Sequence, residues 1–189
     1  MVVRRFNKSI LFFIVLFIFP LVGSTEPRVE KDYYPKGNIR FIIPYNGDKK
    51  EGLCRWYYEN GNIKQETPYK NGLRDGIDQW YHSNGKNHKQ IQYSQGVLHG
   101  FYRVYYNDGS LQEETLYAQG KKHGDYSKYS RKGDLLLKIR YKNDLKEVSL
   151  LFDNNGKPSY RIIYRRGKFW RQERLKATGS MFDALTGKK

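Results

Sequence analysis

The sequence predicts an all-β protein: an elongated ribbon of antiparallel β-hairpins in six 24-residue repeats, with a short C-terminal cap for which a helix is one option. Glycines recur at this interval, an aromatic residue stands four positions before each, and a tyrosine stands eight after. These glycines are Gly37, Gly61, Gly85, Gly109, Gly133 and Gly156. The 189 residues include 17 Tyr and 18 Gly but only 6 Pro, which favours short strands and tight turns over disorder.

Residues 1–24 have the pattern of a secretory signal peptide. Basic residues precede the apolar run Ile10–Phe19, and small residues follow it up to Ser24. This run is too short to span a bilayer comfortably, so we expect cleavage before Thr25. The alternative is an uncleaved signal anchor. The sequence therefore predicts export to the periplasm, the cell surface or the medium, with residues 25–32 as an N-terminal linker.

Residues 33–167 form the predicted repeat domain, and each repeat reads as two strands joined by a hairpin turn. Asn60-Gly61 illustrates the turn. Asn-Gly suits a type I′ turn, in which both central residues have positive φ, so we expect that type here. The second strand carries a β-branched residue six positions after each glycine, which suits one packed and one solvated face. These residues are Ile43, Thr67, Ile91, Thr115, Ile139 and Ile162.

The residues of this period resemble a known family. The stretch from Tyr57 to Gly76, together with Leu98-His99-Gly100 and Lys122-His123-Gly124, is similar to MORN repeats, specifically the bacterial variant form. The likeness covers about residues 33–167 and fades where Asp144 and Glu147 replace turn glycines. The resemblance implies a repeat sheet without shared catalytic residues. It also implies roles that range from antitoxin or immunity protein to protein or phospholipid binding.

The tail, residues 168–189, leaves the period. We expect it to cap the last open strand, because an exposed strand edge invites aggregation. Its apolar residues are Phe169, Trp170, Leu175, Met181, Phe182 and Leu185.

Residues that could carry chemistry are few. His99 and His123 occupy the same repeat position, without the accompanying ligands that a metal site needs. Cys54 lies on a predicted strand and is expected to be a packed thiol rather than a nucleophile. Since no nucleophile elbow, phosphate loop or metalloprotease motif is present, we expect no enzyme, cofactor or metal. The alternative of a cell-wall hydrolase would need acid and base groups that converge in a cleft.

Two surfaces are predicted to bind a partner. The first is an aromatic patch on the first strands, consisting of Trp56, Tyr58, Trp80, His82 and Tyr106. In a single-layer sheet it would be an exposed interaction site, whereas a curled ribbon would bury it. The second is a basic stripe that could hold phosphates or carboxylates, or could be a solvated charged face: Lys138, Arg140, Arg161, Arg165, Arg171 and Arg174.

Charge is concentrated in the C-terminal half. Residues 25–119 carry 13 basic and 12 acidic side chains, whereas residues 120–189 carry 19 and 7. We therefore expect an exported, non-enzymatic binding or scaffold module for a protein partner or an anionic envelope polymer or lipid. Membrane contact would be peripheral or through an uncleaved signal, and export argues against nucleic acid. The alternative is an antitoxin or immunity protein that neutralises one toxin.

Overall fold

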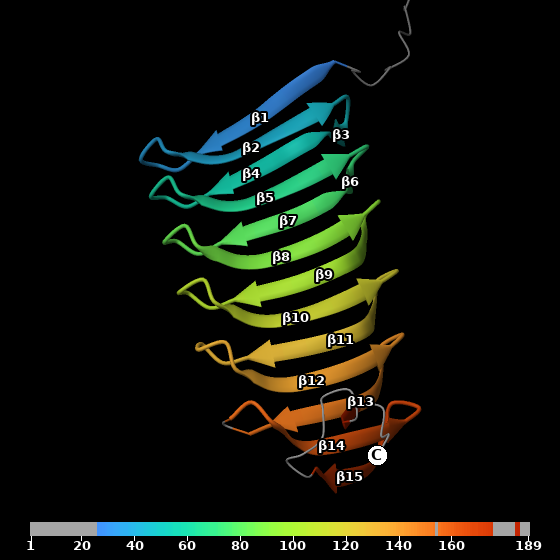
Figure 1. Ribbon diagram of the computed structural model, residues 1–189. Coiled ribbons are helices and arrows are strands. Elements are labelled where there is room, and N and C mark those ends of the chain that lie inside the picture. The colour runs from blue at the N-terminus through green and yellow to red at the C-terminus, as the bar shows by residue number, and fades with distance from the viewer. Residues whose placement is uncertain (1–25, 154, 176–183, 186–189) are drawn as a thin grey trace, which may run out of the picture.

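The structure, a computed structural model, describes residues 26–153, 155–175 and 184–185, and these form one antiparallel sheet of 15 strands (Figure 1). Neighbours in the sheet are neighbours in sequence, which confirms the predicted all-β ribbon of hairpin repeats. The predicted signal peptide, Met181 and Phe182 lie outside the described residues. No helix within the described residues is long and apolar enough to cross a membrane.

The strands follow the repeats, two to each. Their bounds are β1 Pro27–Tyr33, β2 Ile39–Asn46, β3 Lys49–Lys50, β4 Gly52–Tyr57, β5 Ile63–Lys70, β6 Leu73–Arg74, β7 Gly76–Tyr81, β8 Asn87–Ser94, β9 Val97–Tyr105, β10 Leu111–Ala118, β11 Lys121–Tyr129, β12 Leu135–Lys142, β13 Leu145–Phe152, β14 Pro158–Arg165 and β15 Lys168–Arg174. The two-residue strands β3 and β6 continue into β4 and β7 after an interruption and pair with β2 and β5.

The hairpin turns differ from the expected type. Gly61 donates its N–H to the carbonyl of Tyr58, and the Tyr58 N–H donates to the carbonyl of Asn62. Only Gly61 has positive φ, at +88°, and Asn60 does not. This is a three-residue loop that ends in a left-handed glycine, so the type I′ prediction at Asn60-Gly61 is wrong.

Type I′ geometry occurs in the connections between repeats instead. Both central residues of these connections have positive φ, for example Asn71 at 52° and Gly72 at 82°. Gln95-Gly96, Gln119-Gly120, Asn143-Asp144 and Arg166-Gly167 share the pattern. A two-residue connection of this type twists in the sense that its flanking strands require.

In the second to fifth repeats, the first strand is interrupted or bulged near a third glycine. Between β8 and β9, Ile91 pairs with Tyr102 but Tyr93 pairs with Leu98, so that two extra residues fall at His99-Gly100. Gly100 has a φ of +105°. Bulges increase local twist and bend the strand, and Figure 1 shows strands that are curved rather than straight.

Most of the buried side chains lie in one row that runs across the sheet, named here the central row, although Leu150, which has no exposed surface, lies on the opposite face. The central row alternates the β-branched residues of the second strands with residues seven positions before each hairpin glycine, as in the pairs Cys54–Thr67 and Asp78–Ile91. Paired residues share one face of the sheet. The buried members are Ile43, Cys54, Thr67, Asp78, Ile91, Thr115, Ile139 and Ser149. The predicted packing of the β-branched sites is confirmed at five of the six.

The opposite face, named here the ion-pair face, carries charged cross-strand pairs. Arg55 binds Glu66 at 2.8 Å across β4 and β5, and Arg103 binds Glu114 across β9 and β10. Cross-strand pairs of opposite charge stabilise a sheet by a few tenths to about 1 kcal/mol each.

Both ends of the ribbon extend further than the sequence indicated. Residues 27–32, expected as part of a linker, belong to β1, and residues 168–174, expected in a cap, form β15. Phe169 and Trp170 are 64% and 41% exposed on this last strand, so they do not cover it. Ala184 is buried, and its carbonyl accepts a hydrogen bond from Arg161 on the ion-pair face.

Candidate functional site

The predicted aromatic patch is a contact between repeats. The hydroxyls of Tyr58 and Tyr106 donate to the carbonyls of Tyr81 and Tyr129, each 23 positions further along the chain, at 2.8 and 2.9 Å. The His82 ring makes the corresponding contact with the Tyr105 carbonyl at 3.3 Å. Trp56, Tyr58, Trp80, His82 and Tyr106 are all partly buried. Three of the five side chains thus contact the backbone of the next repeat, and the binding role of the patch stays a prediction.

The exposed apolar side chains lie on the other face. Leu53, Ile77 and Leu116 are 36%, 44% and 46% exposed. Leu53 and Ile77 occupy equivalent register positions beside the ion-pair row, where Leu53 faces Pro68. Leu116 occupies the position equivalent to Pro68 and faces Phe101. The sequence analysis did not select these residues, because single exposed aliphatic side chains are common on protein surfaces.

Four members of the predicted basic stripe are held by carboxylates. Asp125 binds Lys138 at 2.9 Å and Arg140 at 3.1 Å. Burial raises the pKa of Asp125, but the hydrogen bonds from Lys138 and Arg140 outweigh it and hold that pKa below its usual value. These two bases are thus partners of an internal carboxylate.

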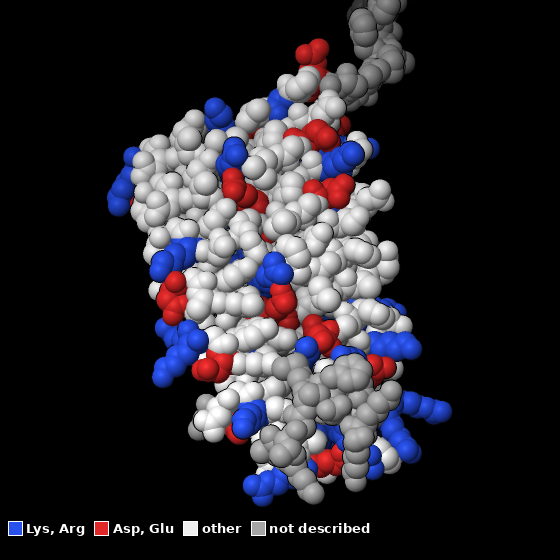
Figure 2. All heavy atoms as spheres, in the orientation of Figure 1, with Lys and Arg blue, Asp and Glu red and all other residues white. Residues whose placement is uncertain are grey.

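Glu173 holds the other two. It binds Arg161, whose side chain is only 12% exposed, and Arg171 at 2.8 Å. The remaining stripe members, Arg165 and Arg174, are exposed. Arg165 stacks over the Trp170 ring at 3.8 Å from its centroid. Figure 2 shows cations interspersed with acidic side chains over the face in view, so the structure does not form one continuous stripe from all six residues.

The histidines and the cysteine that the sequence analysis considered do not gather into one site in the part of the chain that the structure describes. His99 and His123 are exposed, each beside the bulge glycine of its strand. Cys54 has no exposed surface, and burial raises the pKa of its thiol. Within the described residues, no group of three or more His, Cys, Asp or Glu side chains could hold a metal ion.

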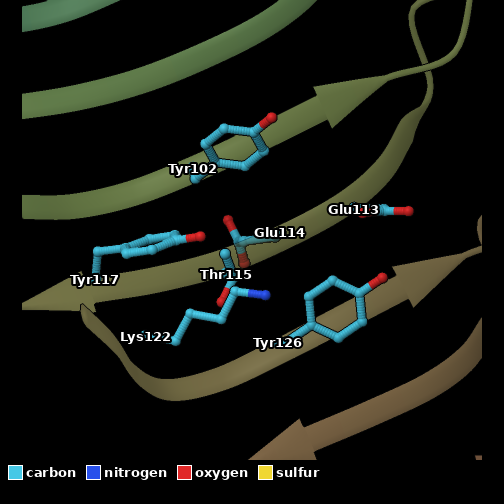
Figure 3. A pocket seen from close by; sticks show the side chains of 7 residues that line it. All are labelled: Tyr102, Glu113, Glu114, Thr115, Tyr117, Lys122 and Tyr126. Atoms are coloured by element: carbon cyan, nitrogen blue, oxygen red, sulfur yellow. The ribbon is translucent and has the colours of Figure 1, made fainter. Parts of the chain in front are cut away.

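A pocket that the sequence analysis missed lies on the central-row face of β9, β10 and β11 (Figure 3). It has a volume of about 260 Å³ and is lined by Tyr102, Glu113, Glu114, Thr115, Tyr117, Lys122 and Tyr126. Thr115 pairs with Tyr102 on one side and Tyr126 on the other. The two rings thus rise from the strands that flank the threonine, which is buried between them.

The pocket exists because two side-chain sizes are exchanged between repeats. In the second and third repeats, small Cys54 and Asp78 stand two residues before large Trp56 and Trp80. In the fourth and fifth repeats, large Tyr102 and Tyr126 precede smaller Val104 and Lys128. This inversion is visible in the sequence and is the signal that could have predicted the pocket.

Among the described residues, Tyr117 lacks the contact with a cation that the equivalent tyrosines of other repeats make. The equivalent tyrosines lie beneath a cation of the same repeat: Lys50 over Tyr69 at 5.1 Å, Arg74 over Tyr93 at 5.0 Å, Lys122 over Tyr141 at 5.2 Å and Lys146 over Tyr164 at 5.7 Å. Leu98 stands where that cation would come from in the fourth repeat. Tyr117 instead lies 6.2 Å from the Tyr102 ring, tilted by 55°.

The pocket contains groups of both charges. Burial and the neighbouring Glu113 carboxylate, to which Tyr126 hydrogen-bonds, raise the pKa of Tyr126 to about 12. The phenol therefore stays protonated at neutral pH. Glu114 is bound by Arg103, and Lys122 brings one ammonium group to the rim. Tyrosine rings, a carboxylate and an amine are groups that can bind a ligand through ring contacts and hydrogen bonds.

Solved structures match parts of the chain. Two solved structures share 15% identity with it. The crystal structure of TarM has a TM-score of 0.36 and is matched over 51% of this chain and 19% of its own. The crystal structure of accessory secretory proteins 1, 2 and 3 of Streptococcus pneumoniae has a TM-score of 0.24, over 65% and 18%. The chain thus spans about a fifth of either matched chain. No curated protein matches it significantly.

The family comparison agrees with the strand pattern. The model of the MORN repeat variant matches residues 29–46, 50–71 and 98–119. Each segment covers one hairpin of the sheet, namely β1–β2, β4–β5 and β9–β10. These three segments of the chain are therefore similar to MORN repeats of the variant form.

Proposed function

We propose that the protein is an exported, non-catalytic binding module that attaches to an anionic envelope surface through its C-terminal half. The observation that carries the proposal is the excess of cations there: residues 120–189 hold 19 basic and 7 acidic side chains. Anionic lipid headgroups and acidic polymers attract such a region from a distance and concentrate the protein at the surface.

The exposed cations of the last hairpin are the best-placed contacts. Arg165, Lys168 and Arg174 are exposed on β14 and β15, and form no ion pair with a carboxylate among the described residues. Arg161 belongs to a different class, because its guanidinium already binds Glu173 and the Ala184 carbonyl. Its reversal would break both bonds and place a second carboxylate beside Glu173, which would disturb the fold, so Arg161 is a poor probe of binding.

The test compares two triple charge reversals with the same net change. One variant carries Arg165→Glu, Lys168→Glu and Arg174→Glu. The matched control carries Lys31→Glu, Lys49→Glu and Lys70→Glu, which are exposed in the first repeats. Co-sedimentation of the chain from Thr25 onward is measured with vesicles of phosphatidylglycerol in phosphatidylcholine and with phosphatidylcholine alone.

Each cation near an anionic surface contributes about 1 kcal/mol, so the first variant should bind about 100-fold more weakly and the control much less so. Added salt should release the native protein from the vesicles and from a membrane fraction of cells. Equal loss in both variants would show that only net charge matters. Retention in high salt with one crosslinked protein would overturn the proposal in favour of a dedicated protein partner, such as a toxin.

A further inference from the structure

We propose that the pocket between Tyr102, Tyr117 and Tyr126 binds a neutral sugar ring, as one unit of a glycan chain. This site is separate from the exposed cations of the last hairpin, and its binding does not depend on their charge.

The size of the pocket suits one ring. Its volume of about 260 Å³ lies just below the range of about 300–1,000 Å³ typical of sites for drug-sized molecules. Tyr102 and Tyr126 flank Thr115 at the floor, and Tyr117 stands beside Tyr102 (Figure 3). A cyclic ligand placed over Thr115 would therefore meet aromatic side chains from more than one strand.

The chemistry of the lining suits a sugar in two respects. Aromatic rings offer apolar faces to the C–H groups of a pyranose, and their hydroxyls remain available for hydrogen bonds. Glu113 accepts hydrogen bonds from hydroxyl groups, and the Lys122 ammonium donates them. A sugar presents both kinds of surface on one ring, with apolar C–H faces and a polar rim.

The local charge favours a neutral ligand over an anion. A phosphate or carboxylate that contacted Lys122 would lie close to the Glu113 carboxylate, which has no cation bound to it in any described ion pair. Glu114 also lines the pocket, but its carboxylate binds Arg103 on the ion-pair face. An anion would therefore be repelled by an acidic group within the same pocket, whereas a hydroxyl would be accepted by it.

The second and third repeats show which side chains could fill the pocket, because they carry a compact polar cluster at the equivalent positions. There, Gln65 and Thr67 donate to Asp78 at 2.8 Å each, and Trp80 follows on the same strand. The equivalent residues around the pocket are Glu113, Thr115, Tyr126 and Lys128. The triple variant Glu113→Gln, Tyr126→Asp and Lys128→Trp thus installs side chains that the same backbone already accommodates two repeats earlier.

The experiment measures saturation-transfer NMR and titration with the tetrasaccharides of glucose and of N-acetylglucosamine, with inorganic phosphate as the anionic probe. We expect saturation transfer to the ring protons of at least one tetrasaccharide. We expect that phosphate does not bind at the site from which these sugars would displace it. The closed triple variant should lose the transfer. The single variants Tyr102→Leu and Glu113→Gln should each weaken binding about tenfold, since each removes one ring or one charged acceptor.

The controls separate this site from other causes. Trp170→Leu removes an aromatic side chain that is 41% exposed on β15, and should leave sugar binding unchanged. The triple reversal of Arg165, Lys168 and Arg174 should also leave it unchanged, which distinguishes failure of this proposal from failure of surface attachment. If neither sugar binds, or if Trp170→Leu weakens binding as much as Tyr102→Leu does, the proposal is overturned. Should the closed variant not fold, the two single variants decide the matter alone.

Discussion

A buried threonine lies between the second and third repeats, and another lies between the fourth and fifth. The backbone around the two is the same, but the pocket lies beside the second threonine. Thr67 lies between Cys54 and Asp78, and it is only 1% exposed. Thr115 lies between Tyr102 and Tyr126, and a pocket remains beside it. A repeat fold can therefore close or open a site without a change in topology, because the exchange of a large and a small side chain two positions apart suffices.

The second and third repeats, named here the closed segment, also contain a buried cluster of hydrogen-bonded polar side chains. Asp78 and Thr67 are each 1% exposed, and Gln65 donates to both. Arg74 lies 3.9 Å from the Asp78 carboxylate. The indole Nε1 of Trp80 is buried beside them without a hydrogen-bond partner. The closed arrangement is thus stabilised by specific hydrogen bonds, whereas the open one relies on half-buried rings.

The largest effect is expected from Asp78→Ala. Gln65 and Thr67 would lose their common acceptor in the interior, and we expect a loss of about 3 kcal/mol in the free energy of unfolding. Urea denaturation measures it. Tyr126→Ala, at the equivalent site of the open segment, should cost less, since Tyr126 is only partly buried. A larger loss for Tyr126→Ala would contradict the contrast between the two segments.

Gly96→Val, in the connection between the third and fourth repeats, should cost about 2 kcal/mol, and Gly72→Val should behave alike. Both glycines have a φ of +82°, which a β-branched residue rarely adopts. At Gly96 an added Cβ would also lie 3.3 Å from Leu73. Thermal melting checks the pair, and unchanged midpoints for both would refute the assignment of these turns.

Thr67→Val and Thr115→Val form a matched pair of nearly equal volume changes. Thr67→Val removes a hydroxyl that donates to Asp78 and accepts from Gln65, so we expect a loss of about 1.5 kcal/mol. The Thr115 hydroxyl has no such partner among the described side chains, and its variant should remain within about 0.5 kcal/mol of the native protein. Chemical denaturation of both proteins side by side provides the comparison.

The smallest effect concerns charge in the fifth repeat. Asp125→Asn should cost about 1 kcal/mol at neutral pH, because Lys138 and Arg140 lose a carboxylate partner that is partly exposed. The folded state lowers the pKa of Asp125, so its contribution is present above the ordinary pKa and is lost as the pH falls through the lowered one. The stability difference between native protein and variant should therefore vanish in acid. A difference that persists there would assign the effect to packing.

Much of the fold could be predicted because its signals repeat. Six copies of the same glycine and tyrosine spacing predicted the strands, the turns and the packed β-branched sites such as Thr67 and Ile139. The predicted type of the hairpin turn was wrong, since Asn-Gly adopts one geometry at Asn60-Gly61 and another at Asn71-Gly72. The edge strand β15 was missed, because hydrogen bonding to β14 continues after the repeat motif has faded.

The candidate sites were less predictable, since they depend on what lies across the sheet. Tyr58 and Tyr106 hydrogen-bond to the backbone of the next repeat, and Arg161 binds Glu173. Nothing in the sequence around these three residues distinguishes them from exposed side chains. By itself the sequence determined the period, the strand pattern and the imbalance of charge, because each is a property of spacing or composition along the chain. Only the tertiary structure decided which tyrosines fasten repeats, which cations are neutralised and where a pocket opens, because these depend on side-chain volumes and partners on neighbouring strands.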